Sequence, residues 1–392
     1  MRTVRVKSVI RNVVQKSDGS PQPFLGLEDL ESGTGRLLVD ELPYKAAEDS
    51  VCHAPGDVLF SKLRPYLAKS YLPKEGGTGT GELLVLRPGP AIDSRFLLYV
   101  TLSAPWVDWA TTTAYGTKMP RTSWELVGNY RFWLPSLERQ SRIADFLDTE
   151  VSRIDRLVTK KRHLIELLNE RINSRVLDHV GASTLVKSNG SPTVPIRRIL
   201  DKVVRAPKAG EDTITAYRDG QVTARSARRA EGYTLPASAE PQGQHVEVGD
   251  VVIHGLDGFA GAIGTSEARG NCSPVYHVCV PRGNGDTRFL GRLLRLLALQ
   301  GYLGNFATST RERAVDFRNW DLFGRIPIPD VSVSEQREIG DWISNIRPLR
   351  EVIERSATLA RERRQALITA AVTGQFDVIS ASGRNVTEGV CA

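Results

Sequence analysis

A stretch from Ser136 to Val180 contains neither proline nor glycine, and it constrains the fold more than any other feature of the chain. Its apolar residues recur at steps of three and four, which is the spacing of one stripe along an α-helix. About 44 helical residues would make a rod of roughly 65 Å, and a rod with one apolar stripe requires a long partner helix. The stripe consists of Ile143, Leu147, Val151, Ile154, Val158, Ile165, Leu168, Ile172 and Val176.

A second stretch, residues 331–378, has the same character and is the expected partner. Gln336 follows Gln140 by 196 positions, and the apolar residues that follow each glutamine fall into the same register. Pro348 interrupts this second stretch. Because proline removes a backbone hydrogen bond, we expect the helix to kink or break there. The second stripe consists of Ile339, Ile343, Ile346, Ile353, Ala360, Leu367 and Ala371.

The repeat extends into the segments that precede the two helices. Gly56-Asp57-Val58-Leu59 recurs as Gly249-Asp250-Val251-Val252, and Arg95-Phe96-Leu97 recurs as Arg288-Phe289-Leu290, each after 193 positions. Landmarks in the same order at a fixed period indicate two copies of one structural unit. Short runs bounded by Gly or Pro predict strands over 57–61, 82–86, 250–254 and 275–280, and apolar periodicity predicts short helices over 96–102 and 289–299.

The expected fold is therefore α+β: two domains of mixed α/β character, each followed by a long helix, in a pseudo-twofold repeat. The predicted organisation is a first domain over 1–135, a first helix over 136–180, and a linker rich in Gly, Ser, Thr and Pro over 181–195. A second domain over 196–330, a second helix over 331–378 and a loose tail over 379–392 follow.

Composition narrows the class of protein. The net charge is +7, and residues 181–330 contribute most of it, with 19 lysines and arginines against 15 acidic residues. A basic excess in the domains suits a polyanionic partner. The N-terminus has no apolar signal region, no run is long enough to span a membrane, and the four cysteines form no C-x-x-C pair. We therefore expect a cytoplasmic protein without disulfides or a metal site.

Motifs for catalysis are missing from the sequence. There is no G-x-x-x-x-G-K-[ST] loop for nucleotide phosphates, no N-P-P-[YF] motif of an amino-methyltransferase and no H-E-x-x-H metal motif. The glycines at 33–35 and 77–81 do not open helices, so they are interpreted as loop residues. The sequence predicts a protein that binds rather than catalyses.

Over residues 1–378, the chain resembles a known family, the specificity subunits of type I restriction–modification systems. The resemblance is carried by G-D-V-L-F-S-K-L-R-P-Y-L-A-K at 56–69, L-P-S-L-E-R-Q-S-R-I-A-D-F-L-D at 134–148, I-P-I-P and S-E-Q-R-E-I within 326–339, and L-I-T-A-A-V-T-G-Q-F-D-V at 367–378. It implies two target-recognition domains and two spacer helices paired as an antiparallel coiled coil. The implied coiled-coil core is Ile143, Leu147, Ile154, Val158, Leu168, Ile172, Ile339, Ile343, Ile346, Ile353 and Leu367.

The resemblance also implies a function. Each domain would read one half of a bipartite, asymmetric DNA target, and the helices would set the distance between the halves. The chain itself would be non-catalytic and would bind no cofactor. Two methyltransferase subunits, and restriction or translocase subunits with them, would bring S-adenosylmethionine, ATP and Mg. Glu138-Arg139-Gln140, where the family has adjacent Glu-Gln, and Pro348 depart from the family pattern.

Candidate DNA-binding residues follow from chemistry, because Arg, Lys, Tyr, Ser and Thr side chains contact phosphates and base edges. We chose loops that follow strands or carry basic clusters. The candidates are Lys62, Arg64, Tyr66, Lys69, Tyr115, Thr117, Lys118, Arg121, Arg225, Arg228, Arg229, His254, Thr308, Ser309, Arg311 and Arg313. The alternative for the charged residues is a solvated surface or a local ion pair, and for the tyrosines it is a place in the core.

Two other functions stay open on sequence alone. One is a self-sufficient methyltransferase or nuclease with atypical motifs, which transfer or cleavage by the isolated chain would indicate. The other is a coiled-coil scaffold whose globular domains bind proteins, which a lack of DNA affinity at low salt would indicate.

Overall fold

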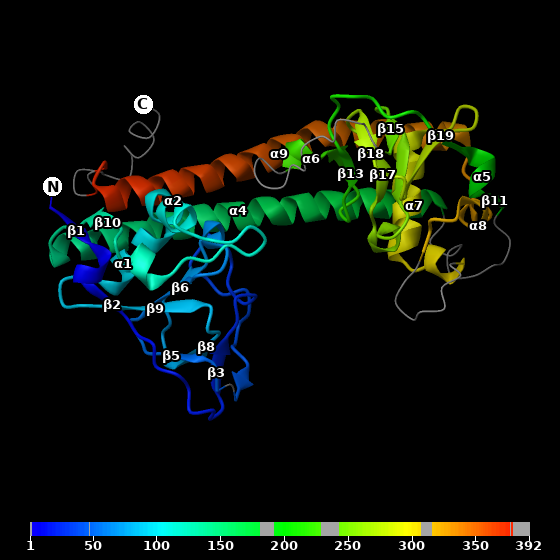
Figure 1. Cartoon of the computed structure of the whole chain (residues 1–392). Coiled ribbons are helices and arrows are strands. Elements are labelled where there is room, and N and C mark those ends of the chain that lie inside the picture. The colour runs from blue at the N-terminus through cyan, green and yellow to red at the C-terminus, as the bar shows by residue number, and fades with distance from the viewer. Residues whose placement is uncertain are drawn as a thin grey trace. The chain divides into compact units, whose positions relative to one another are not determined.

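The computed structural model describes residues 2–46, 48–180, 192–228, 243–306, 316–376 and 378. It divides into two compact units, Met1–Lys161 with Arg355–Ala392, and Arg162–Glu354. Each unit contains one globular domain, part of the long helix α4 (Leu137–Val180) and part of the long helix α9 (Val333–Thr373) (Figure 1). The expected α+β class with two long helices is confirmed. No described helix is long and apolar enough to cross a membrane.

The first domain is built on two four-stranded sheets, in which nearly all neighbouring strands are antiparallel. Figure 1 shows their strands on one side of the helical layer of this unit. One sheet has the order β2-β9-β6-β7 and the other the order β4-β3-β8-β5, in which β3 and β8 alone run parallel. The strands are β2 (Ile10–Asn12), β3 (Gln22–Leu25), β4 (Tyr44–Lys45), β5 (Val51–His53), β6 (Val58–Ser61), β7 (Ser70–Tyr71), β8 (Gly77–Gly79) and β9 (Leu83–Pro88).

Short helices and one further strand pair join this domain to α4. The Asp93 carboxylate caps α1 by accepting a hydrogen bond from the amide of Phe96. The strand just before α4 pairs with the strand at the N-terminus of the chain, so the start of α4 is held to the domain. The elements are β1 (Thr3–Arg5), η1 (Val6–Ser8), η2 (Pro65–Leu67), α1 (Ser94–Leu102), α2 (Ala104–Thr112), α3 (Trp124–Val127) and β10 (Arg131–Trp133).

The second domain repeats the central sheet, in the order β12-β19-β16-β17, with a longer helix α7 packed on it. Two strand pairs, β13-β14 and β15-β18, take the place of the second sheet of the first domain. The elements are β11 (Thr193–Pro195), α5 (Ile196–Ile199), β12 (Leu200–Val203), β13 (Ile214–Ala216), β14 (Val222–Ala224), α6 (Arg225–Arg228), β15 (Gln244–Val246), β16 (Val251–His254), η3 (Gly258–Ala260), β17 (Ile263–Thr265), β18 (Gly270–Cys272), β19 (Tyr276–Pro281), α7 (Thr287–Leu299), η4 (Leu303–Phe306), α8 (Trp320–Phe323) and β20 (Pro327–Pro329).

The repeated Gly-Asp pair has the same structural role in both domains. The Asp57 carboxylate accepts a hydrogen bond from the Ala54 amide at 2.8 Å, and Asp250 accepts one from the Glu247 amide at 2.8 Å. The preceding glycine has a φ of 86° in the first domain and 93° in the second, which favours a residue without a Cβ. Each aspartate closes the tight turn that leads into the central strand, which explains why this dipeptide marks the repeat.

In the first unit, α4 and α9 share one apolar core with the domain. A hydrogen bond from Lys161 to Ser356 and an ion pair between Asp155 and Arg364 at 3.0 Å show that α9 runs antiparallel to α4 there. The core of the second unit likewise includes residues of both helices, and Arg175 of α4 lies over the Trp342 ring of α9 at 4.8 Å.

Three details differ from the sequence-based predictions. The second helix continues through Pro348, because one lost hydrogen bond is offset by long helical stretches packed on either side. That helix ends at Thr373 rather than 378. Residues 193–195, placed in the linker, form β11 and pair with β20 just before α9. Residues 181–191 of the predicted linker and the whole predicted tail, 379–392, lie outside the described residues.

Candidate nucleic-acid interface

In the first domain, the structure brings together the two loops singled out in the sequence. One follows β6, and the other connects α2 to α3. The amide of Arg64 donates to the carbonyl of Pro120 at 2.7 Å, and the amide of Thr122 donates to the carbonyl of Lys62 at 3.0 Å. Residues distant in the sequence therefore form one surface. We name it the first recognition loop pair, residues 61–69 with 114–121.

Arg64 and Ala68, in the first loop of this surface, have an uncommon backbone conformation. They are the two non-glycine residues with positive φ, at 50° and 46°, among the described residues. Left-handed backbone costs an L-residue roughly 1–2 kcal/mol, and such strain concentrates at functional sites. Between them, η2 carries Tyr66 with 51% of its surface exposed. Arg64 is also exposed, so this turn presents a cation and an aromatic ring to solvent.

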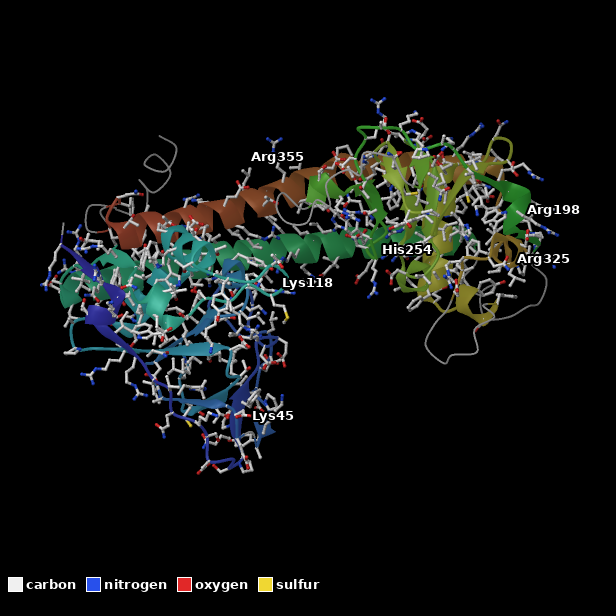
Figure 2. All side chains as sticks on the ribbon, viewed as in Figure 1. Lys45, Lys118, Arg198, His254, Arg325 and Arg355 are labelled. Carbon is white, nitrogen blue, oxygen red and sulfur yellow. The ribbon has the colours of Figure 1, made fainter. Side chains whose placement is uncertain are left out.

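The second loop of the pair adds further exposed groups. Tyr115 is 64% exposed, and Thr117 is exposed in the same loop. Lys118 is exposed there as well (Figure 2). The core alternative for Tyr66 and Tyr115 is therefore excluded by their exposure. Met119, which was not selected from the sequence, is 48% exposed in the same loop.

Two cations selected in this domain have local partners. Arg121 donates to both carboxylate oxygens of Glu82, at 2.9 Å and 3.0 Å at the closest, and these bonds raise the pKa of the guanidinium. The ammonium of Lys69 donates to the carbonyl of Leu27. Both side chains tie the loops to neighbouring segments of the domain. By contrast, the half-buried Lys62 and the exposed Arg64 and Lys118 make no ion pair with a described residue.

The second domain repeats the backbone link between its two loops. The amide of Phe317 donates to the carbonyl of Gly255 at 2.8 Å, the counterpart of the bond between Thr122 and Lys62. The loop chemistry differs, because Gly255 and Asp257 stand where the first domain has Lys62 and Arg64. Asp257 pairs with Arg218 at 2.9 Å.

His254 has an internal role in this loop. Its Nδ1 accepts hydrogen bonds from the amides of Leu256 and Asp257, both at 3.1 Å, and its ring lies 4.5 Å from that of Tyr276. Burial lowers the pKa of the imidazole, which favours the neutral form that can accept these bonds. The position of this side chain fits turn stabilisation better than base contact.

Two residues of the predicted basic cluster, Arg225 and Arg228, lie on α6. Arg228 pairs with Asp219 at 2.5 Å and lies over the Tyr217 ring at 4.2 Å, so it is held locally. Arg225 is exposed. The remaining candidates of this domain, Arg229, Thr308, Ser309, Arg311 and Arg313, lie outside the described residues.

One functional candidate was missed from the sequence. Phe259 lies on η3, 37% exposed, 193 positions after Tyr66 on η2. The repeat offset was sufficient to find it: Ala68 and Gly261, also 193 apart, both have positive φ, so the two turns are equivalent. Each domain thus presents one exposed aromatic ring at the same place, among different polar neighbours.

The residues predicted for the coiled-coil core differ in their burial. Seven are buried and four are half-buried. The buried ones are Ile143, Leu147, Ile154, Val158, Ile172, Ile339 and Leu367, and the half-buried ones are Leu168, Ile343, Ile346 and Ile353.

Metal-ligating groups do not cluster in the part of the chain that the structure describes: no group of three or more His, Cys, Asp or Glu side chains could hold an ion there. Cys52, Cys272 and Cys279 are free thiols, and burial raises the pKa of Cys272 to about 12. Such a thiol is protonated at neutral pH and unreactive.

Comparison with solved structures identifies the fold. A chain from a structure described as the "structural basis underlying complex assembly and conformational transition of the type I R-M system" matches with a TM-score of 0.52 and 17% identity, over 96% of this chain and 98% of that one. An HsdS subunit from Thermoanaerobacter tengcongensis matches at 0.41 and 18%, over 96% and 97%. A type I restriction–modification S subunit from M. genitalium matches at 0.44 and 12%, over 95% and 96%.

The first of these matches carries the assignment. The chain has the fold of a component of a type I restriction–modification system, in agreement with the resemblance seen in the sequence. No family model matches the chain, and no curated protein matches it.

Proposed function

We propose that this chain is the DNA-specificity subunit of a type I restriction–modification complex. The observation that carries the proposal is the duplication of one architecture with different recognition loops. The same turn, the same loop-to-loop hydrogen bond and an exposed aromatic ring recur in both domains, whereas the cations around them do not. Two domains of one fold with different loop chemistry suit two different half-sites on one duplex, and so an asymmetric, bipartite target.

In the first domain, Lys62, Arg64 and Lys118 provide cations for phosphates and guanine edges, and Tyr66 and Tyr115 provide rings beside them. Lys69 and Arg121 support these loops through Leu27 and Glu82. In the second domain, Phe259 and Arg225 take part, together with the candidates between 308 and 313.

The chemistry is supplied by partner subunits. The chain docks methyltransferase subunits. The internal repeat offers two equivalent surfaces and so favours two copies, and a restriction or translocase subunit joins them. S-adenosylmethionine, ATP and Mg belong to those partners. The helices α4 and α9, each of which takes part in both units, set the separation of the half-sites.

Methylation mapping by long-read sequencing tests the proposal. A host expresses the methyltransferase encoded beside this chain, with or without the chain itself. We expect a new methylated motif of two unequal parts that depends on the chain. Methylation by the methyltransferase without a motif, in the presence of the chain, would contradict the proposal and favour the scaffold function. Methyl transfer or cleavage by the purified chain alone would favour the self-sufficient enzyme.

A further inference from the structure

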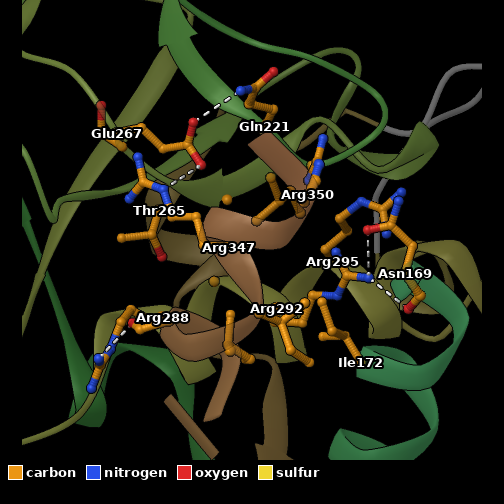
Figure 3. Close-up of a pocket in the computed structure, with 18 of the residues that line it drawn as sticks. Asn169, Ile172, Gln221, Thr265, Glu267, Arg288, Arg292, Arg295, Arg347 and Arg350 are labelled. Atoms are coloured by element: carbon orange, nitrogen blue, oxygen red, sulfur yellow. Dashed lines mark hydrogen bonds and ion pairs between the residues drawn. The ribbon is translucent and has the colours of Figure 1, made fainter. Parts of the chain in front are cut away.

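A cavity of about 150 Å³ lies within the second unit, and neither the proposed DNA recognition nor the helix packing accounts for it. Its walls come from α4, α7, α9 and the end of β17, and Asn169, Ile172 and Thr265 are among the residues that line it (Figure 3). The chemical character of the walls is unusual for a junction between helices, because arginine is the most frequent lining residue.

Five arginines line the cavity against three carboxylates, Glu267, Glu351 and Glu354. On α9, Arg347 pairs with Glu351 at 2.9 Å and approaches Glu267 at 3.7 Å, and Arg350 pairs with Glu354 at 2.8 Å. Arg288, at the start of α7, pairs with Asp286 and, at 2.8 Å, with Asp341. These ion pairs leave the other two α7 arginines, Arg292 and Arg295.

Arg292 and Arg295 are half-buried, and neither forms an ion pair with a described residue. Arg292 donates to the carbonyl of Asn169 and Arg295 to the carbonyl of Arg218, both at 3.0 Å, but the buried Nε–H group of each has no described acceptor. Burial, and then the nearby Arg295 and Arg350, lower the pKa of Arg292 to about 9. Both guanidinium groups stay protonated. Their positive charges have no ion-pair partner in the described part of the chain, and such charges are costly in a site withdrawn from water.

The first unit has different residues at the positions of these arginines. The register fixed by the equivalent pairs Arg95–Asp145 and Arg288–Asp341 relates the two units. At the positions of Arg292, Arg295, Arg347 and Arg350, the first unit has Tyr99, Leu102, Val151 and Ile154. Those four residues are buried in its continuous apolar core. The first unit thus has no cation at these four positions, and the buried arginine of its junction, Arg364, is paired with Asp155 at 3.0 Å. In the second unit, Arg292 and Arg295 have no such carboxylate partner among the described residues.

We propose that this cavity is a binding site for an oxyanion of the phosphate class, held by Arg292 and Arg295. Guanidinium groups form two parallel hydrogen bonds with tetrahedral oxyanions, and an anion would accept from the unpartnered Nε–H groups. A water molecule occupies about 30 Å³ of liquid, whereas drug-sized ligands need pockets of at least about 300 Å³. The volume fits one phosphate with a few waters, either as the free ion or as the terminal phosphate of a nucleotide.

Calorimetric titration of the full chain with inorganic phosphate, at constant ionic strength, tests the site. We expect saturable binding that Arg292→Gln weakens by about tenfold or more, since a charge-assisted hydrogen bond is lost. Arg198→Gln is the matched control, because Arg198 is an exposed arginine on α5 of the same unit (Figure 2). ATP and adenosine titrations identify the source: ATP binding tighter than phosphate, without adenosine binding, indicates a nucleotide, and phosphate binding alone indicates the free ion.

A second variant separates loss of the site from loss of folding. Arg295→Leu with Arg350→Ile installs two of the four first-unit residues, those equivalent to Leu102 and Ile154. We expect this double variant to unfold at a Tm equal to or above that of the unliganded wild type, since apolar replacement of buried charges is often neutral or stabilising. Phosphate should raise the Tm of the wild type but not that of the variant. No saturable binding to the wild type, or equal weakening by Arg292→Gln and Arg198→Gln, would overturn the proposal.

Discussion

Gln140 in α4 and Gln336 in α9 make the same hydrogen bond in the two units. The side-chain oxygen of Gln140 accepts from the backbone amide of Asp93 at 2.8 Å, and that of Gln336 accepts from the amide of Asp286 at 3.1 Å. Each aspartate caps the domain helix that follows it. The first turn of each long helix is thereby fixed to the first turn of a domain helix. This contact joins the long helix to the globular domain of the same unit.

Replacement of Gln140 by alanine should destabilise the first unit by about 1–3 kcal/mol, because buried backbone groups lose their partners. The side-chain nitrogen also donates to the carbonyls of Ala91 and Pro135, at 3.0 Å and 2.9 Å, so several groups are left unsatisfied together. Chemical denaturation of the full chain measures the change. Arg153→Ala, at an exposed position on the same helix, is the control, and equal effects of the two substitutions would contradict the prediction.

The buried ion pair between Arg364 of α9 and Asp155 of α4 supports a second prediction. Arg364 is 5% exposed, and its guanidinium also donates to the carbonyls of Gly33 and Thr34 in the domain, at 2.7 Å and 3.0 Å. Arg364→Ala should cost about 3–5 kcal/mol, since Asp155 then stays buried without its main partner. Arg363→Ala, at an exposed position on the same helix, should change stability by less than about 0.5 kcal/mol.

The double variant Asp155→Leu with Arg364→Leu tests the origin of that cost. If the cost arises from the uncompensated carboxylate, the double variant should be less destabilised than Arg364→Ala in the same denaturation experiment. A double variant that is at least as unstable would show that the bonds to Gly33 and Thr34 dominate.

Periodicity and repetition in the sequence were enough to predict the two long helices, their register and the duplicated domain. The glutamines, the Gly-Asp turns and the apolar stripes each recur at a fixed offset, and each has a local physical cause. The helix was expected to kink or break at Pro348, and it does not break there, because packing along its length outweighs one lost hydrogen bond. Strand β11 was also missed, since the pairing of Thr193–Pro195 with Pro327–Pro329 is a long-range contact that composition does not reveal.

The candidate site was less predictable. Three residues were selected because their types suit DNA, but each has a hydrogen-bond partner within its own domain. Arg121 donates to Glu82, Lys69 donates to Leu27, and His254 accepts from the turn that follows it. Which cation has a local partner depends on tertiary contacts. Phe259 was predictable through the offset of 193, whereas the arginine-lined cavity emerged only when the packed residues of the two units were compared.

Charge removal in the first recognition loop pair should weaken DNA binding. We expect Arg64→Ala to cost the assembled complex about 1–3 kcal/mol of binding free energy and to relax one half of the methylated motif only. Lys118→Ala should lower affinity for all sequences and reduce the salt slope by about one unit, as for a phosphate contact. Lys45→Ala, at an exposed lysine elsewhere on the first domain, should leave both measurements unchanged (Figure 2). Loss of specificity in the other half would contradict the assignment.

The equivalent aromatic residues should act on different halves of the target. Tyr66 and Phe259 are 51% and 37% exposed, so substitution with alanine should change stability little. Tyr66→Ala should change how methylation depends on the sequence of one half of the motif. Phe259→Ala should change how it depends on the other half. Methylation rates on a library of sequences varied in one half at a time measure this. An identical dependence for both variants would contradict the proposal of one half-site per domain.

Protonation of His277 should make the second unit less stable as the pH falls. This imidazole is 2% exposed, its Nε2–H donates to the carbonyl of Phe317 at 2.6 Å, and its Nδ1 has no partner among the described residues. Burial lowers its pKa below the ordinary value of about 6.5, so below that pH the unfolded chain binds more protons than the folded one. The stabilisation from neutral His277 is thus present above about pH 6.5 and is lost as the pH falls, at no more than about 1.4 kcal/mol per pH unit. Denaturation of the full chain between pH 7.5 and 5.5 should show a smaller slope for His277→Gln, which retains a donor and does not titrate. His163→Gln on α4, where the histidine is exposed, should leave the slope unchanged.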